Sequence, residues 1–369
     1  METSKIVFVG GHHNSALALA KALRIKGYKI YWFGHKQTMR KERSLSLEFQ
    51  EVRKNGFPFY EIKTGKFYRT YCPWQFFKIF FGFLKSFFLL YKIKPKLVIS
   101  FGGYLSFPVV LAAFLLRIKV LIHEQTSCVG LANRLLASIA CRILLTWSSS
   151  KKFFPVSKSQ VIGLPLDSSF LGRTKTHSPF PEKLPIILIT GGKQGSHVIN
   201  RAIEDQLTNF LSDFNLIHQT GGILKTGDFS RLLKKKDLLP EKLKSRYLIK
   251  KFFYGSKMIE MIKTADLVIS RSGGHIVYEL AYLAKPAILV PFPWAYNNEQ
   301  LANAKILSRQ GSALILEQKK LKGTVLLKTA KYLIKHQKEF RQKALSFKKE
   351  VVKDANKKMV VIIEKMIPR

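Results

Sequence analysis

The sequence predicts an α/β protein with two doubly wound parallel sheets, and three features predict it. Short apolar runs such as KIVFV (5–9) and AILVPFP (287–293) alternate with segments of helical pattern. The runs are continuously apolar, which is typical of parallel strands that helices cover on both faces. A polar stretch at 168–184 interrupts the series, and the same pattern restarts after it. The restart predicts two domains.

The expected strands can be placed in order along the chain. The first series comprises the runs 5–9, 29–34, 96–103, 119–124 and 142–147, and the second comprises 186–192, 215–222, 247–253, 266–274 and 287–293. From these runs we expect an N-terminal domain over 1–165, a C-terminal domain over 166–345, and a C-terminal helix over 346–369 that packs back on the N-terminal domain.

Each series opens with a strand, a glycine pair and a helix. The two openings read VGGHHNSALALA and ITGGKQGSHVINRAI. A helix that starts after such a turn presents free N–H groups and a partial positive charge to an anion. Because ligands of open α/β folds bind at the carboxyl ends of the strands, we expect a binding cleft at that edge.

Charge is the most unusual property of the composition. The 369 residues include 63 Lys and Arg against 23 Asp and Glu, a formal net charge of +40. An excess of that size predicts a polyanionic partner: nucleic acid, an anionic membrane surface or a phosphorylated substrate. The three cysteines, Cys72, Cys128 and Cys141, lack CxxC spacing and predict neither a disulfide framework nor a zinc site.

The window between Glu61 and Glu124 has no acidic residue, and it contains the densest aromatic run of the chain, Phe67–Tyr91. Lysines, an arginine and a proline interrupt this run, so it falls short of the roughly 18 apolar residues of a spanning helix. A basic, aromatic helix suits the headgroup region of an anionic leaflet. Nucleic-acid binding would interleave basic residues with isolated aromatics, so no nucleic acid is expected. The candidate membrane contacts, with neighbouring lysines, are Trp74, Phe76, Phe77, Phe80, Phe81, Phe83, Phe87 and Phe88, about half of which would belong to the core.

Two stretches of the second half suit a nucleotide. The glycines of GGKQGS (191–196) allow a tight turn and a close approach of backbone to a ligand, although a packing turn would use them equally well. The pattern is neither GxGxxG nor Walker A, which disfavours a dinucleotide cofactor or ATP. In SRSGGHIVYEL (270–280), Glu279 can accept both hydroxyls of a ribose while the helix N-terminus faces a diphosphate. The alternative is that Glu279 only complements the helix dipole.

Amide side chains gather in PFPWAYNNEQLANA (291–304). Amides supply donors and acceptors in fixed directions, as recognition of neutral sugar hydroxyls requires. A helix cap would explain Asn297 and Asn298, but it explains Gln300 poorly.

The first glycine loop, Gly10-Gly11-His12-His13, has three interpretations. A dinucleotide loop is disfavoured, because no GxGxxG pattern follows and no acidic residue lies at the expected distance. A metal pair is disfavoured, because adjacent histidines diverge and no further ligands gather nearby in the sequence. The third interpretation is a histidine base on a loop that feeds a helix.

At this point the motifs resemble a known family. HEQTSCVGLANRLL (123–136), FGGYLSFPVVLAA (101–113), GGKQGS, RSGG with Glu279, and NNEQLANA are similar to the lipid-linked N-acetylglucosaminyltransferases of glycosyltransferase family 28. The resemblance spans residues 5–310 with the motifs in order. It implies the GT-B architecture, in which two Rossmann-like domains face a central cleft.

The resemblance also implies an activity. Family members move GlcNAc from UDP-GlcNAc to the C4 hydroxyl of lipid I, undecaprenyl-diphospho-MurNAc-peptide, and so make lipid II for peptidoglycan. The anomeric centre inverts without a covalent intermediate. The sequence has no DxD-type metal motif, so neither a metal nor a cofactor is expected. The N-terminal domain would bind the acceptor and the membrane, the C-terminal domain would bind UDP-GlcNAc, and the protein would lie peripherally on the cytoplasmic face of the plasma membrane.

Site residues follow from the resemblance position by position. The donor side would comprise Lys193, Gln194, Gly195, Phe253, Tyr254, Arg271, Ser272, Gly273, Glu279, Glu299 and Gln300. The acceptor side would comprise Gly10, Gly11, Gly102, Gly103, Tyr104, Glu124, Gln125 and Asn133. His12 would be the catalytic base, since imidazole titrates near neutrality, and His13 a bystander. A structural, helix-capping His12 is the alternative.

The sequence also departs from the family pattern. The first loop is shortened from GGTGGH to Gly10-Gly11-His12, and the remaining departures are Ser15 for proline, Phe107 for glycine, Thr126 and Leu164 for asparagine, and Lys193 for serine. We therefore expect the acceptor side to differ most from the relatives. The alternative functions are a related GT-B enzyme with another lipid-linked acceptor, a UDP-GlcNAc 2-epimerase, and a non-catalytic basic binding protein.

Overall fold

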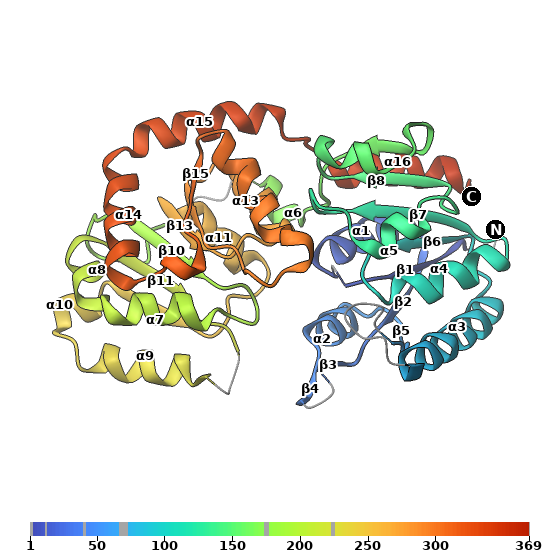
Figure 1. Cartoon of the computed structure of the whole chain (residues 1–369), viewed down its shortest axis with the longest axis horizontal. Coiled ribbons are helices and arrows are strands. Elements are labelled where there is room, and N and C mark those ends of the chain that lie inside the picture. Colours follow the sequence, from blue (N-terminus) through green and yellow to red (C-terminus); the bar gives the residue numbers. More distant parts are fainter. Residues whose placement is uncertain are drawn as a thin grey trace. The chain divides into compact units, whose positions relative to one another are not determined.

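The computed structural model describes residues 3–11, 13–39, 42–65, 73–172, 177–222 and 226–368. The chain forms two compact units (Figure 1): unit 1 comprises residues 1–168 and 352–369, and unit 2 comprises residues 169–351. The boundaries thus lie a few residues beyond 165 and 345. Helix α15 (Gln337–Glu350) belongs to unit 2, and only α16 (Ala355–Met366) returns to unit 1.

Unit 1 is built on a seven-stranded parallel sheet of order β5-β2-β1-β6-β7-β8-β9. Its strands are β1 (Lys5–Val9), β2 (Lys29–Gly34), β5 (Phe59–Glu61), β6 (Leu97–Ser100), β7 (Lys119–Glu124), β8 (Arg142–Leu145) and β9 (Ser159–Val161). The strand order reverses between β1 and β6. Ligands of open α/β sheets bind outside the carboxyl ends of the strands at such a reversal.

Side chains of the central strand alternate between the two faces of this sheet. Ile6 and Phe8 pack with α1 (His13–Ile25) and α16, whereas Val7 and Val9 pack with α3 (Pro73–Ile93) and α4 (Ser106–Leu115). Helix α16, red in Figure 1, contributes Met359 and Ile363 to the first of these cores. The end of the chain is therefore an integral part of unit 1.

Unit 2 repeats the plan with a six-stranded parallel sheet of order β12-β11-β10-β13-β14-β15. The strands are β10 (Ile186–Thr190), β11 (Asn215–Gln219), β12 (Tyr247–Lys250), β13 (Leu267–Ser270), β14 (Ala287–Leu289) and β15 (Ala313–Ile315). One core cluster joins the sheet to α7 (His197–Asp205), α8 (Leu207–Asp213), α9 (Asp228–Asp237) and α14 (Gly323–Lys335). The strand order reverses between β10 and β13, so this unit has its own expected ligand edge.

The remaining elements connect these layers. They are β3 (Gln37–Met39), β4 (Glu42–Leu45), α2 (Leu47–Lys54), α5 (Leu131–Leu136), α6 (Ser168–Leu171), α10 (Glu241–Lys244), α11 (Ser256–Thr264), α12 (Gly274–Leu283) and α13 (Glu299–Arg309). Strands β3 and β4 pair antiparallel, apart from the parallel sheets.

Helix α3 carries the aromatic run predicted to contact a membrane. More of its aromatics are exposed than the half that the sequence suggests, because only Phe83 and Phe87 of the eight candidates pack against the core. The exposed ones are Trp74, Phe76, Phe77, Phe80, Phe81 and Phe88. In the part of the chain that the structure describes, no helix has the length and apolarity needed to cross a bilayer.

Candidate functional site

The loops that follow β1 and β6 meet at the reversal point of unit 1. Gly11 N–H donates to the carbonyl of Gly102 over 3.3 Å. Gly10 has a φ of +124°, and a Cβ there would lie 2.5 Å from the Gly102 oxygen. Gly102 and Gly103 also have positive φ, and a Cβ on Gly102 would meet the Asn133 amide at 2.9 Å. Glycine is therefore required where these two backbones touch, and five expected acceptor residues lie together.

The histidines of the first loop differ in what the structure describes. His12, the expected base, lies outside the described residues. His13 begins α1, and its Nε2 lies 3.1 Å from a carboxylate oxygen of Glu51 on α2. That contact gives His13 a structural partner.

Tyr104 follows the second glycine pair and stacks on His35, with ring centroids 5.3 Å apart. Burial, and then the nearby charge of Glu48, raises the pKa of Tyr104. Glu48 is itself unusual: burial raises its pKa to about 7, although the indole N–H of Trp32 donates to its Oε1 over 2.8 Å. Sequence reasoning missed Glu48 and His35, because neither belongs to a motif.

Glu124 organises the loop after β7. Its Oε1 accepts the backbone N–H of Thr126 at 3.0 Å and the Thr126 hydroxyl lies 2.8 Å away, while its Oε2 accepts from Gly130 N–H at 3.2 Å and from Asn133 Nδ2 at 2.9 Å. Such a set of donors fixes the carboxylate and therefore the course of the loop. Thr126 therefore contributes to the structure of this loop through its contacts with Glu124.

The adjacent Gln125, unlike Glu124, is buried without hydrogen-bond partners for its side chain among the described residues. Only 1% of its surface is exposed. Neither its amide oxygen nor its amide nitrogen has a hydrogen-bond partner within the described residues. A buried polar group without a partner destabilises a fold by about 1–3 kcal/mol, so this amide favours an additional polar contact.

In unit 2 the loop after β10 forms a tight turn. Gly195 N–H donates to the Gly192 carbonyl over 3.1 Å, and both glycines have positive φ. A Cβ on Gly195 would lie 2.0 Å from the carbonyl oxygen of Thr220, so only glycine fits against the loop that follows β11. The side chains of Lys193 and Gln194 lie on this turn, half-buried and exposed respectively.

Helix α12 begins directly after the loop of Arg271, Ser272 and Gly273. Its N-cap residue Gly273 makes no side-chain capping bond. Glu279 lies in the second turn, where its Oε1 is 2.7 Å from Nδ1 of His275. The i,i+4 spacing of these two residues on one helix is the sequence signal that predicts such a pair.

Arg271 and Ser272 make contacts within unit 2. The Arg271 guanidinium donates to the carbonyls of Val290 and Pro291 at 3.2 and 3.3 Å, and to Gln318 at 2.8 Å. Burial lowers its pKa to about 10, so it remains cationic at neutral pH. Ser272 is buried, and its hydroxyl donates to the Gln300 carbonyl over 2.7 Å. Both residues therefore hold the segment that carries the amide cluster.

That segment turns sharply before α13. Asn297 and Asn298 have φ values of +47° and +52°, a region that asparagine tolerates better than most residues. Asn298 precedes α13 without a side-chain capping bond, so a side-chain cap does not explain it. Gln300 Oε1 accepts the backbone N–H of Phe292 over 3.0 Å, and Glu299 begins the helix.

The expected uracil-side aromatics follow β12. The backbone N–H of Phe253 donates to Oε1 of Gln219 over 2.8 Å. Tyr254 is exposed, and its ring centroid lies 5.7 Å from that of Phe252. Gln219 was not predicted by any motif.

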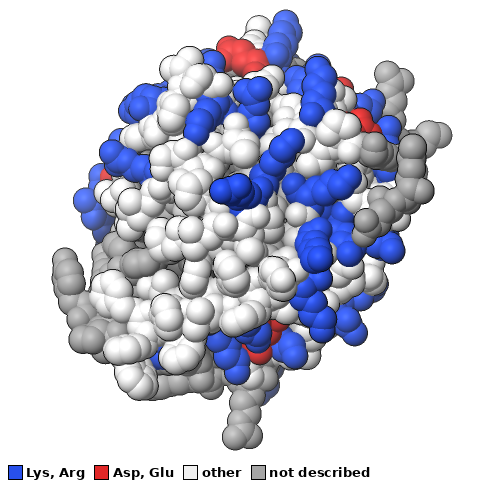
Figure 2. Space-filling model, turned by 90° about the vertical axis from the view of Figure 1, so that its right-hand side faces the viewer, with Lys and Arg blue, Asp and Glu red and all other residues white. Residues whose placement is uncertain are grey.

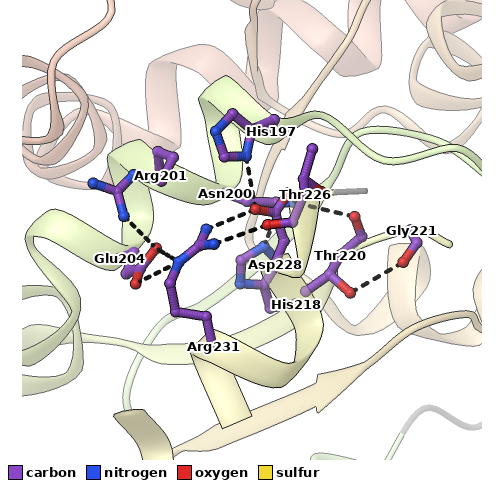
Figure 3. Close-up of polar contacts among 10 residues, drawn as sticks. All are labelled: His197, Asn200, Arg201, Glu204, His218, Thr220, Gly221, Thr226, Asp228 and Arg231. Atoms are coloured by element: carbon purple, nitrogen blue, oxygen red, sulfur yellow. Dashed lines mark hydrogen bonds and ion pairs between the residues drawn. The ribbon is translucent and has the colours of Figure 1, made fainter. Parts of the chain in front are cut away.

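A buried polar network lies beside the loop that follows β11 (Figure 3). Asn200 of α7 donates from Nδ2 to Asp228 over 2.8 Å and to the Thr220 carbonyl over 3.0 Å. Its Oδ1 can only accept, so Nε2 of His218, 3.0 Å away, carries the proton. His218 Nδ1 then accepts from the hydroxyl of Tyr247 at 2.9 Å. This imidazole is neutral, because burial lowers its pKa to about 3.

The network continues from Asp228 toward the surface (Figure 3). Asp228 Oδ1 lies 2.7 Å from His197 Nδ1 and 2.7 Å from an Arg231 nitrogen, and Arg231 also pairs with Glu204 at 2.8 Å. Burial acts to raise the pKa of Asp228, but the hydrogen bonds from Asn200, His197 and Arg231 outweigh it and lower that pKa. The whole group anchors the start of α9 to α7.

Metal ligands do not gather in the described residues, where no group of three His, Cys, Asp or Glu side chains could hold an ion. Cys128 and Cys141 form no disulfide within the described residues, and Cys72 lies outside them.

Comparison with known proteins matches both units. The N-terminal domain model of glycosyltransferase family 28 matches residues 9–145, and the C-terminal domain model of the same family matches residues 186–359. The chain belongs to glycosyltransferase family 28. The predicted family and the two-domain GT-B fold are thereby confirmed.

Relatives of this family 28 chain match it over most of its length. One is the UDP-N-acetylglucosamine–N-acetylmuramyl-(pentapeptide) pyrophosphoryl-undecaprenol N-acetylglucosamine transferase of Clostridium botulinum (strain Langeland), 32% identical over 342 residues, 89% of this chain and 90% of the relative. The protein of the same name from Clostridium tetani is 30% identical over 93% of this chain and 94% of its own.

Solved structures extend the comparison. Acinetobacter baumannii MurG has a TM-score of 0.71 and 26% identity, covering 98% of this chain and 99% of its own. A UDP-GlcNAc 2-epimerase from Neisseria meningitidis has a TM-score of 0.66 at 15% identity, covering 98% of this chain and all of its own. At that identity the epimerase shows a shared fold only, so it does not support the epimerase alternative.

Proposed function

We propose that this family 28 chain transfers GlcNAc from UDP-GlcNAc to the C4 hydroxyl of lipid I and so makes lipid II for peptidoglycan. The observation that carries this conclusion is the match to relatives named for that transfer, which covers about nine-tenths of both chains. In the reaction the C4 oxygen attacks C1 of GlcNAc while the bond from C1 to the UDP oxygen breaks. The configuration inverts, the hydroxyl proton passes to a base, and UDP leaves.

The donor side belongs to unit 2 in this proposal. Glu279, held by His275, would accept the ribose hydroxyls through its carboxylate. The turn of Lys193, Gln194 and Gly195 and the N-terminus of α12 would face the diphosphate with backbone N–H groups. The same groups would stabilise the charge that develops on the leaving UDP.

The remaining donor contacts concern the sugar and the base. Glu299 and Gln300, at the start of α13, would bond the GlcNAc hydroxyls, while Arg271 and Ser272 keep that segment in place. Phe253 and Tyr254 would lie beside the uracil. This arrangement fits a nucleotide sugar, whose ribose would meet a carboxylate, whose diphosphate would meet backbone N–H donors and whose sugar hydroxyls would meet the start of α13.

The acceptor side belongs to unit 1. The paired glycine loops at the reversal of its sheet bring Gly10, Gly11, Gly102 and Gly103 together, and we place the acceptor diphosphate there. The amide of Gln125, which has no hydrogen-bond partner among the described residues, is suited to hydrogen-bond the acceptor sugar. We assign the base to His12, next to these glycines in the sequence.

The membrane surface belongs to helix α3 and its basic surroundings. Figure 2 faces the end of unit 1 that carries both chain termini, and shows a broad uncharged area bordered by Lys and Arg with few Asp or Glu. A cavity of about 620 Å³ at the C-terminal end of α3 is lined by apolar side chains and by Lys94, Lys96, Arg117 and Lys119. Exposed aromatics beside cations favour an anionic leaflet. We place the protein peripherally on the cytoplasmic face of the plasma membrane.

Substrate omission tests this function against its alternatives. UDP release from UDP-GlcNAc is measured with lipid I, without lipid I, and with undecaprenyl-diphosphate that lacks the sugar. Transfer to lipid I requires both substrates, so release is expected only with lipid I. Conversion of UDP-GlcNAc alone to its 2-epimer would support an epimerase, and binding without turnover in any mixture would support a binding protein.

A further inference from the structure

Gln219 ends strand β11 with a buried side chain that bonds in three directions. Its Nε2 donates to the hydroxyl oxygen of Thr190 over 3.0 Å and to the Gly192 carbonyl over 3.2 Å. Its Oε1 accepts the backbone N–H of Phe253 over 2.8 Å. The side chain is 4% exposed, so its hydrogen-bonding capacity serves the protein interior.

The two Nε2 contacts lie on the turn that we assign to the diphosphate. The Gly192 carbonyl also accepts Gly195 N–H at 3.1 Å, which closes the turn, and Gly192 N–H donates to the Thr190 hydroxyl oxygen at 3.1 Å. Gln219 therefore bonds both acceptors that define the shape of the turn. Loss of its amide would leave these groups with fewer partners in a buried place.

The third contact lies on the segment that we assign to the uracil. Phe253 follows strand β12, and β11 lies between β12 and β10 in the sheet. A side chain at the carboxyl end of the middle strand is thus placed to reach the loops of both neighbours. Backbone bonds from Thr220 N–H and Gly221 N–H to Lys250 and Lys251 hold the β12 side, but they do not reach Gly192.

The two residues after Gln219, Thr220 and Gly221, are held by the polar network of Figure 3 and by a close backbone contact. Asn200 donates to the Thr220 carbonyl over 3.0 Å. Gly221 packs so closely on Gly195 that a Cβ added to Gly221 would lie 2.3 Å from the Gly195 Cα. Gln219 is consequently fixed at its backbone. Its amide can then act as a rigid link between the two loops.

We infer that Gln219 is a positioning residue for the nucleotide sugar: it sets the distance between the diphosphate turn and the uracil-side segment without touching the substrate. This inference rests on the proposed donor site of unit 2. It implies that Gln219 governs donor affinity much more than the rate of bond formation, because both loops bind the unreacting part of the donor.

Two variants separate the contacts of Gln219. Gln219→Met keeps the length of the side chain but removes all three bonds. Gln219→Glu keeps the acceptor for Phe253 N–H and replaces the amide donor with an oxygen that repels the Gly192 carbonyl. The matched control is Asn215→Leu, because Asn215 is the buried first residue of the same strand and its amide donates to the carbonyls of Glu182 and Leu184 at 2.8 and 3.2 Å.

The full chain is assayed for KM and kcat with UDP-GlcNAc at saturating lipid I, for the Kd of UDP by calorimetry, and for Tm. Both Gln219 variants are expected to raise donor KM and UDP Kd at least about tenfold, as loss of buried hydrogen bonds predicts, with kcat within about threefold and lipid I KM unchanged. Asn215→Leu is expected to lower Tm comparably and to leave donor KM and UDP Kd unchanged.

Three results would overturn the inference: wild-type donor KM and UDP Kd in Gln219→Met, wild-type values in Gln219→Glu, or an equal rise in the Asn215→Leu control. UDP binding keeps this test separate from the proposed reaction. A wild-type chain that binds UDP but transfers nothing to lipid I would contradict the proposed function, while the Gln219 comparison would still be decided by UDP Kd.

Discussion

At the scale of single residues, Glu279 and His275 form the clearest donor-side pair. The 2.7 Å contact between them occupies one carboxylate oxygen and orients the other. A carboxylate held in this way can accept two hydroxyl hydrogens from one ribose. The pair lies on α12, whose N-terminus faces the carboxyl edge of the sheet, so ribose and diphosphate would be bound by one element.

Replacing Glu279 tests this assignment. Glu279→Ala is expected to raise the KM for UDP-GlcNAc at least about tenfold, because hydrogen bonds to a charged acceptor are lost. Glu279→Gln, which keeps the shape and one acceptor, is expected to have a smaller effect. Steady-state kinetics at saturating lipid I measure both, and an unchanged KM in Glu279→Ala would remove Glu279 from the ribose site.

The histidine pair of the first loop offers an internal control. His12→Ala is expected to lower kcat with little change in UDP-GlcNAc binding, because a base acts on the acceptor hydroxyl in the transition state. His13→Ala is expected to change neither quantity, since His13 bonds Glu51. Equal kcat losses in both variants, measured by turnover and UDP titration, would refute a specific role for His12.

Glu48 predicts a pH dependence of stability. Its pKa is raised from 4.5 to about 7 in the folded chain, so its stabilising contribution is complete below pH 4.5 and is lost as pH rises through 7. Glu48→Gln is therefore expected to have a higher Tm than wild type at pH 8, with the difference shrinking at pH 5. Thermal unfolding at both pH values measures this, and a difference that grows toward pH 5 would contradict the raised pKa.

Single site residues can be predicted from the sequence where they belong to a local motif. They cannot be predicted where their contacts lie far away along the chain. Glu279 and the glycine loops could be proposed as site residues from the sequence, because a strand, glycines and a helix leave a local pattern. Gln219 contacts residues 27 and 34 positions away, so no local pattern marks it. Glu48 owes its raised pKa to burial, which only the fold creates.

At the scale of elements, α3 is a 21-residue helix, and it has an exposed aromatic stripe. Trp74, Phe77, Phe81 and Phe88 follow helical spacing and are each more than half exposed. A helix of this length extends about 30 Å, enough to lie along a bilayer surface. The opposite side, with Leu90 and Ile93, belongs to the core of unit 1.

A double variant tests the membrane role of this stripe. Phe77→Ser/Phe81→Ser is expected to reduce binding to vesicles with anionic lipid at least about tenfold, because two large apolar side chains leave the interface. The control pair Val156→Ser/Leu238→Ser removes exposed apolar residues elsewhere. Vesicle sedimentation measures both, and equal losses in the two pairs would contradict a specific role for α3.

Element-scale predictability depended on length. The long central strands were predicted, but their ends were not: the run 96–103 gives β6 only over Leu97–Ser100, because Gly102 and Gly103 adopt positive φ and leave the sheet. The edge strands β5, β9 and β15 have three residues each and were missed. Runs that short carry no readable periodicity.

At the scale of the whole molecule, two parallel sheets each present a reversal point, one with paired glycine loops and one with a glycine turn and the N-terminus of α12. The repeated strand pattern predicted two doubly wound domains. It could not predict the strand order, because order depends on which helices cross which face. The net charge of +40 pointed to polyanions and fits a diphosphate donor, a diphosphate acceptor and an anionic leaflet together.

The proposed transfer is tested most directly by identifying the glycosidic linkage in the product that the full chain makes. The purified protein is incubated with UDP-GlcNAc labelled in the sugar and with lipid I, and the lipid fraction is analysed by radioactivity and by NMR of the anomeric proton. The proposed transfer predicts label in the lipid fraction, joined to C4 of MurNAc in the β configuration. Label that stays in the aqueous fraction, or an α linkage in the lipid product, would contradict it.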